Sequence, residues 1–115
     1  MEDNQKSLAS YTLKLSNTAY SELKVICARH EKFQYLYELN DEVIHWALEQ
    51  ASLLVALAPY KGEGKYRPYY VSNKSVGKIT NLAKKLQCND TRAVYTALEY
   101  YLNNNTEIFN KIIKS

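Results

Sequence analysis

The chain has 115 residues, a formal net charge of +3 and 46% hydrophobic residues, which suits one small globular domain with a single core. No apolar run is long enough to span a membrane and the polar start is no signal peptide, so we expect a cytoplasmic protein. No nucleotide-binding glycine motif, hydrolase motif or metalloprotease motif is present, and the few cysteines and histidines are too far apart for a metal site. We therefore expect no enzymatic activity, no cofactor and no metal.

The first strand is predicted to follow a flexible segment at residues 1–9. From Ser10 onward polar and apolar residues alternate, which is the pattern of a strand with one face on the core. Leu13 and Leu15 are expected to face the core. Ser10, Thr12 and Lys14 then point away from it.

Two helices are predicted next. The first runs from about Thr18 to Glu31 after a Ser16–Asn17 cap. An aromatic stretch within residues 30–40 either extends this helix and packs, which we prefer, or forms a partner surface. Asn40 or Asp41 is expected to cap the second helix, which continues through Leu57.

Residues 59–65, with one proline and two glycines, are predicted to be a linker. In the second strand, Tyr69 and Val71 are taken as the inward pair, so that Pro68 and Tyr70 point outward. A shift of one residue would exchange the two faces, and the sequence leaves that choice open.

Ser72–Asn73 suits the cap of a further helix, with apolar residues from Val76 to Leu86. After the polar break at residues 87–90, a second apolar stripe continues to Tyr101. Residues 103–105 are three asparagines, predicted to break this helix before a short amphipathic helix at residues 106–114. That last helix either folds back on the body, which we prefer, or contacts another molecule.

The two halves look like divergent copies of one unit. Ser16–Asn17 stands 56 residues before Ser72–Asn73, and Ala47-Leu48-Glu49 stands 50 residues before Ala97-Leu98-Glu99. The copies would span residues 10–58 and 66–102, with about six extra residues within 30–40 of the first. The alternative is four unrelated helices with chance matches.

The segment VSNKSVGKITNLAKKLQCNDTRAVYTALEYYL resembles the ribbon-helix-helix DNA-binding family of the MetJ, Arc and CopG kind. Two copies in one chain would be similar to TraY-type proteins. The resemblance implies a mainly α fold with one two-stranded antiparallel ribbon, built as a tandem single-chain pseudo-dimer. It also implies that the ribbon enters the major groove of DNA.

The resemblance also implies which residues contact DNA. The ribbon residues would be Ser10, Thr12, Lys14, Pro68 and Tyr70. Lys65 and Arg67 would reach phosphates from the strand, and Asn89, Thr91 and Arg92 would do so at a helix N-terminus. In the first copy, Asp41 and Glu42 would repel a phosphate, which is a departure from the family.

The charge distribution agrees with an unequal role for the two halves. Residues 1–58 hold five Lys/Arg and eight Asp/Glu, a net of −3, whereas residues 59–115 hold ten and four, a net of +6. Phosphate attraction supplies most non-specific DNA affinity. We expect a sequence-specific, nucleoid-associated repressor that binds double-stranded DNA, and self-association on the DNA is left open. The alternatives are a plasmid-transfer (relaxosome) accessory protein and an antitoxin-like protein-interaction module without DNA binding.

Overall fold

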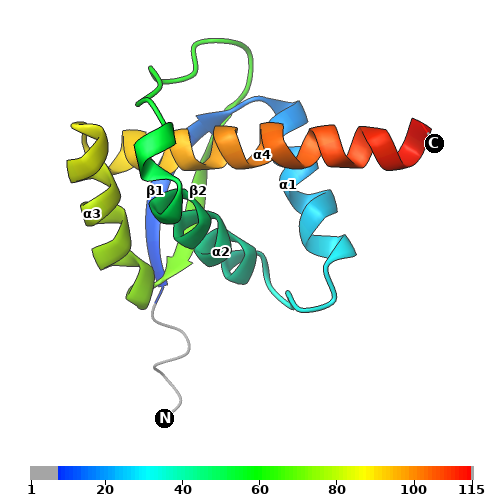
Figure 1. Ribbon diagram of the computed structural model, residues 1–115, viewed down its shortest axis with the longest axis horizontal. Coiled ribbons are helices and arrows are strands. Elements are labelled where there is room, and N and C mark those ends of the chain that lie inside the picture. The colour runs from blue at the N-terminus through cyan, green and yellow to red at the C-terminus, as the bar shows by residue number, and fades with distance from the viewer. Residues whose placement is uncertain (1–7, 115) are drawn as a thin grey trace.

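The computed structural model describes residues 8–114, with side chains for residues 8–104, and it shows a mostly helical protein with one two-stranded sheet (Figure 1). Strand β1 (Leu8–Leu15) precedes helices α1 (Asn17–Arg29) and α2 (Leu36–Glu49), and strand β2 (Lys65–Ser72) precedes helices α3 (Val76–Leu86) and α4 (Asp90–Lys114). Two short 3-10 turns, η2 (Ala51–Leu53) and η3 (Asn73–Ser75), follow α2 and β2. The predicted fold class is confirmed at this level.

The two strands pair antiparallel along their whole length, with Leu8 opposite Ser72 and Leu15 opposite Lys65. Leu13, Tyr69 and Val71 are buried on the inner face. The prediction that Tyr69 and Val71 face inward is therefore confirmed, and the shifted alternative is excluded. β1 begins at Leu8, so residues 8–9 are strand and not flexible. The remainder of that predicted segment, residues 1–7, lies outside the described residues.

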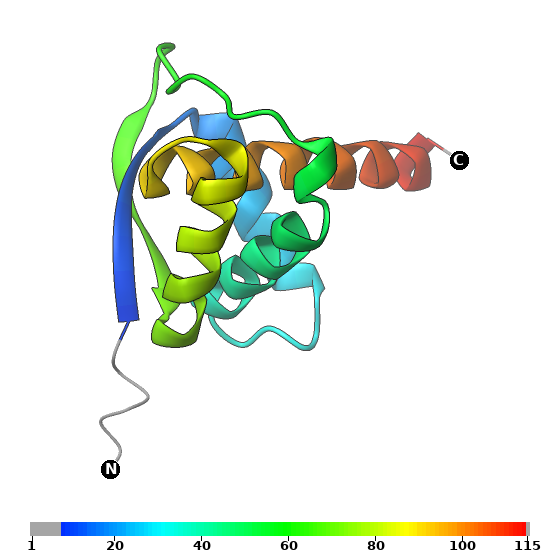
Figure 2. The ribbon, with the colours of Figure 1, turned by 60° about the vertical axis from the view of Figure 1, so that its left-hand side comes forward.

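The core lies between the ribbon and the helices, which sit on one side of it (Figure 2). α2 packs against β2 and α4, and α4 packs against α3 and β1. These contacts bury apolar side chains that recur every three or four residues, as expected for helices with one face on a core. The largest fully buried ones are Leu23, Leu39, Ile44, Ile79, Leu82, Leu98 and Leu102.

The first half departs from prediction at α2. α1 begins as expected, because the Ser16 hydroxyl oxygen accepts the backbone N–H of Ala19 at 3.0 Å. The aromatic stretch does not extend α1, which ends at Arg29, and α2 already begins at Leu36. The Glu38 carboxylate accepts the backbone N–H groups of Gln34 and Tyr35 at 2.7 and 2.8 Å, which satisfies the helix start. The prediction that Asn40 or Asp41 caps this helix is therefore wrong.

α2 also ends earlier than predicted, at Glu49 instead of Leu57. The chain then crosses to α4. There the backbone N–H of Leu57 donates to the Thr96 hydroxyl at 2.9 Å, and its carbonyl accepts from Arg92 Nε at 3.0 Å. These long-range bonds replace the helical hydrogen bonds that a longer α2 would have given Leu57.

In the second half, Ser72 is the cap residue of η3, which leads directly into α3, as predicted in position. Its hydroxyl makes no cap bond, however, and its backbone N–H donates to Asp41. Two predictions about the end of the chain are wrong. α4 continues without a break through the three asparagines to Lys114, and its C-terminal part projects from the body without folding back (Figures 1 and 2). An asparagine inside a helix costs less than about 1 kcal/mol, which is too little to end a well-packed helix.

Candidate functional site

The outward-facing residues of the ribbon form the candidate site, which we call the outer ribbon face. Strand alternation sends every second side chain away from the helices, and pairing sets Ser10 beside Tyr70, Thr12 beside Pro68, and Lys14 beside Tyr66. Five of these six side chains are exposed and Lys14 is half-buried. Four of the five residues predicted for this surface, Ser10, Thr12, Pro68 and Tyr70, are therefore exposed together, and Lys14 lies among them.

The face has a different chemistry on each strand. β1 presents the hydroxyls of Ser10 and Thr12 and the ammonium of Lys14, all of which donate hydrogen bonds. β2 presents two tyrosines around a proline, and these rings are 72% exposed at Tyr66 and 47% exposed at Tyr70. The Lys14 ammonium lies 6.0 Å from the centre of the Tyr66 ring, at the outer limit of a cation–π contact.

The start of α4 adjoins this face. A hollow of about 140 Å³ is bounded by Thr12, Lys14 and Tyr66 on the ribbon and by Thr91 and Arg92 of α4, with other residues. The predicted residues from two distant parts of the sequence are therefore brought together here. Donors from the ribbon and from the first turn of α4 face one region of space.

The α4 start itself is only partly free. The Asn89 side chain caps the helix by accepting the backbone N–H of Arg92 at 2.8 Å. The Nε–H of Arg92 donates to the backbone carbonyl of Leu57. Thr91 is exposed.

Tyr95, which also lines the hollow, stays protonated at neutral pH. Burial raises the pKa of its phenol, and the neighbouring Glu99 carboxylate raises it further by its charge and by a hydrogen bond. The hydroxyl is therefore a neutral group beside the ribbon.

The two basic residues predicted at the start of β2 are placed differently. Lys65 is exposed at the end of the strand. Arg67 is on the inner side opposite Leu13, where its guanidinium carbon lies 3.7 Å from the centre of the Tyr20 ring of α1. Its Nε is buried and has no hydrogen-bond partner among the described residues. Arg67 thus belongs to the contact between β2 and α1 and not to the outer ribbon face.

At the other end of the ribbon, α2 holds β2 in place. The Asn40 amide, 2% exposed, donates to the carbonyl of Tyr70 at 2.7 Å. One Asp41 oxygen accepts the backbone N–H of Ser72 at 2.9 Å and the hydroxyl of Ser75 at 2.7 Å. Sequence reasoning missed these roles because the partners lie at least 30 residues away. The only signal was the departure of Asp41 from the family pattern.

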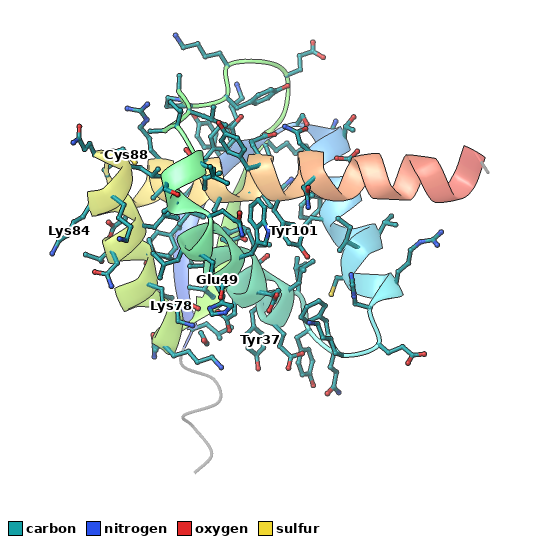
Figure 3. The ribbon with its side chains drawn as sticks, viewed as in Figure 1. Tyr37, Glu49, Lys78, Lys84, Cys88 and Tyr101 are labelled. Carbon is teal, nitrogen blue, oxygen red and sulfur yellow. The ribbon has the colours of Figure 1, made fainter. Side chains whose placement is uncertain are left out.

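A second hollow, of about 650 Å³, lies at this end and mixes charges. Its walls include Lys32, Lys74 and Lys78 together with the acidic groups of α2, which are Glu38, Asp41 and Glu42. Figure 3 shows Lys78 and Tyr37 at this end of the molecule, and Lys84 at the opposite end of α3, pointing away from the body. The acidic groups make this end less suited to a phosphate than the α4 end.

Among residues 8–104, whose side chains the structure describes, no three His, Cys, Asp or Glu side chains are grouped so as to hold a metal ion. No helix within residues 8–114 combines the length and the apolar character that crossing a membrane requires.

Comparison of the chain with protein-family models, with curated proteins and with solved structures found no match.

Proposed function

We propose that this chain is a sequence-specific double-stranded DNA-binding protein that inserts its outer ribbon face into the major groove. The single observation that carries the proposal is the exposed two-stranded ribbon with hydrogen-bond donors on its outer side. The major groove admits a two-stranded ribbon and offers acceptors on every base pair. Transcriptional repression is the proposed role, which would place the protein on the nucleoid.

The strand register supports a fused pseudo-dimer of the ribbon-helix-helix kind. Thr12 and Pro68 are 56 residues apart, which is the spacing between Ser16–Asn17 and Ser72–Asn73. In the ribbon, Thr12 and Pro68 are paired with each other, near the middle of both strands. A two-fold axis relating the two halves would pass between two equivalent residues that are paired with each other. Thr12 and Pro68 form such a pair.

The packing between halves gives further support. α4 contacts β1 and α2 contacts β2, so the second helix of each half covers the strand of the other half. α2 also packs against α4. Neither half would bury its own apolar residues alone, which is the property expected of two intertwined units.

The charges favour binding that is stronger on one side. Three basic residues lie near the α4 end of the ribbon with one acidic residue, Asp90, whereas three lysines and three acidic residues line the hollow at the α2 end. The basic residues of the α4 end are Lys14, Lys65 and Arg92. Equivalent positions of the two strands also differ, since Lys14 corresponds to Tyr70 at the spacing of 56. We therefore propose that the bound DNA sequence is asymmetric.

The experiment is fluorescence anisotropy with labelled duplex DNA over a series of salt concentrations. The proposal predicts binding that weakens as salt rises, because phosphate contacts release counterions. Lys14→Ala should cost about 1–3 kcal/mol at particular base pairs if Lys14 contacts a base. Lys24→Ala removes the same charge from an exposed position on α1 and should change specific binding little. Equal losses on all sequences for both variants would contradict base contact by Lys14.

A protein-interaction module is the second candidate, favoured by the large exposed rings of Tyr66 and Tyr70 on the ribbon, since tyrosine is enriched in protein interfaces. Absence of any salt-dependent binding to duplex DNA would favour this candidate. A relaxosome accessory role would use the same ribbon on DNA, and the identity of the bound sequence would separate it from repression.

A further inference from the structure

We propose that the connecting segment between the two halves, residues 54–64, is a positioning element for DNA binding. Its Leu57 holds the Arg92 side chain of α4 so that the free end of the guanidinium meets a DNA phosphate beside the outer ribbon face. This inference rests on the proposed function. It adds a role for Leu57 and for Thr96, which act through Arg92 and do not contact the DNA themselves.

The contact between Leu57 and α4 uses both polar groups of one peptide residue. The backbone N–H of Leu57 donates to the Thr96 hydroxyl, and its carbonyl accepts from Arg92 Nε. Arg92 and Thr96 are four residues apart, so their side chains lie on the same side of the helix. Thr96 is 0% exposed, so water does not compete for its hydroxyl. Thr96 therefore fixes Leu57, and Leu57 in turn fixes Arg92.

The connecting segment is held at two further points. The Tyr60 hydroxyl donates to the carbonyl of Glu63 at 2.8 Å, which closes the turn between them. Gly64 lies so close to the carbonyl of Leu15 that a Cβ atom at this position would overlap it. The segment is therefore tied to α4 near one end and to the end of β1 at the other.

The bond at Nε leaves the other end of the Arg92 guanidinium available. The group is planar and carries five N–H donors, of which Nε holds one. The terminal nitrogens of Arg92 make no hydrogen bond or ion pair with the other described residues. They can donate in parallel to two oxygens of a phosphate. Because an anchored side chain has less conformational freedom to lose on binding, the bond at Nε favours this contact.

Arg92 also lines the hollow between the ribbon and the start of α4. The other polar side chains in its wall are hydroxyl groups and the ammonium of Lys14, and no acidic side chain among residues 8–104 lines it. The nearby Asp90 carboxylate accepts from the Thr80 hydroxyl of α3 at 3.4 Å. A DNA phosphate beside an inserted ribbon would therefore meet positive charge and hydrogen-bond donors here.

Fluorescence anisotropy with full-length variants and duplex DNA tests the positioning role. Thr96→Val keeps the shape of the side chain but removes the acceptor of the Leu57 N–H, whereas Thr96→Ser keeps the hydroxyl. Thr96→Val should raise the DNA dissociation constant about tenfold, and Thr96→Ser should stay within about twofold of wild type. Circular dichroism at the assay temperature confirms that each variant is folded.

The same substitution in an Arg92→Ala background separates positioning from a general loss of stability. Arg92→Ala alone should weaken DNA binding and lower the salt slope by about one contact. If Thr96 acts through Arg92, Thr96→Val should cause no further loss in this background. The control is Ser75→Ala, which removes a buried hydroxyl bond to Asp41, and its effect on DNA binding should be the same in both backgrounds.

The outcomes separate this inference from the proposed function. If wild type binds DNA and Thr96→Val binds equally well, or if Thr96→Val causes the same loss with and without Arg92, the positioning role is overturned and the proposed function stands. If wild type shows no salt-dependent binding to duplex DNA, the proposed function is overturned and this inference with it.

Discussion

α2 and α4 are each the second helix of one half of the chain, and their first turns differ. α4 begins at Asp90 after a conventional Asn89 cap, next to the outer ribbon face. α2 begins at Leu36, about one turn before Asn40 and Asp41, and uses these two residues to hold β2 and η3. The same residue types serve capping in one helix and long-range hydrogen bonding in the other. The difference leaves Thr91 exposed in the first turn of α4 and engages Asn40 and Asp41 of α2 within the fold.

Of the proposed variants, Asp41→Ala tests this difference between the two helices with the largest expected effect. It leaves the Ser72 N–H and the Ser75 hydroxyl without their acceptor, and an unpaired buried donor costs about 1–3 kcal/mol. We expect the free energy of unfolding to fall by about 2–3 kcal/mol in urea denaturation. The matched variant Asp90→Ala, in the first turn of α4, should cost about 1 kcal/mol or less. Equal losses would show that Asp41 has no special role.

The pH dependence of stability tests the environment of Tyr69, which is buried on the inner face at the same end of the ribbon. Its pKa is raised well above 10.0, first by complete burial and then by the charge of Asp41. Because the folded pKa lies above the unfolded one, the unfolded chain loses this proton first, and stability is lost as pH rises above about 10. The loss should be about 1.4 kcal/mol per pH unit for this group.

Tyr69→Phe removes one titrating group, so the free energy of unfolding should fall less steeply with pH above about 10 than in wild type. At pH 7 it should change stability little or raise it, because the Tyr69 hydroxyl has no hydrogen-bond partner among the described residues. Urea denaturation at several pH values measures both effects. Identical alkaline slopes for wild type and variant would contradict the buried, neutral phenol.

The smallest expected effects concern Ser16 and Ser72, which occupy equivalent positions at the repeat spacing of 56 residues. Ser16 caps α1, so Ser16→Ala should cost about 1 kcal/mol. The Ser72 hydroxyl is buried without a partner among the described residues, so Ser72→Ala should be neutral or slightly stabilising. Denaturation midpoints measure both. A larger loss at Ser72 would mean that its hydroxyl contributes a bond that the structure does not show.

The sequence predicted best where local pattern decides structure. Leu13, Leu15, Tyr69 and Val71 alternate with polar residues and face the core as expected, because a strand has a period of two. The outer ribbon residues followed from the same pattern. The α3–α4 turn was also predicted, and there Gln87 takes a left-handed conformation with φ of 59°.

Prediction failed where distant partners decide. Asn40 and Asp41 look like caps in sequence, but Tyr70, Ser72 and Ser75 engage them across the ribbon. α2 ends at Glu49, and Leu57, which was expected to lie in this helix, instead bonds to Thr96 and Arg92 of α4, far away in the sequence. Arg67 was expected to face phosphates, and its stacking on Tyr20 depends on where α1 packs.

Selection of bound fragments from a pool of random DNA duplexes tests the central claim most directly. If the ribbon that enters the groove consists of two non-identical strands of one chain, the selected fragments should share a short consensus that is not palindromic. Lys14→Ala should relax that consensus at a few positions and leave the others unchanged. A pool that shows no enrichment, or a perfectly palindromic consensus, would contradict the account.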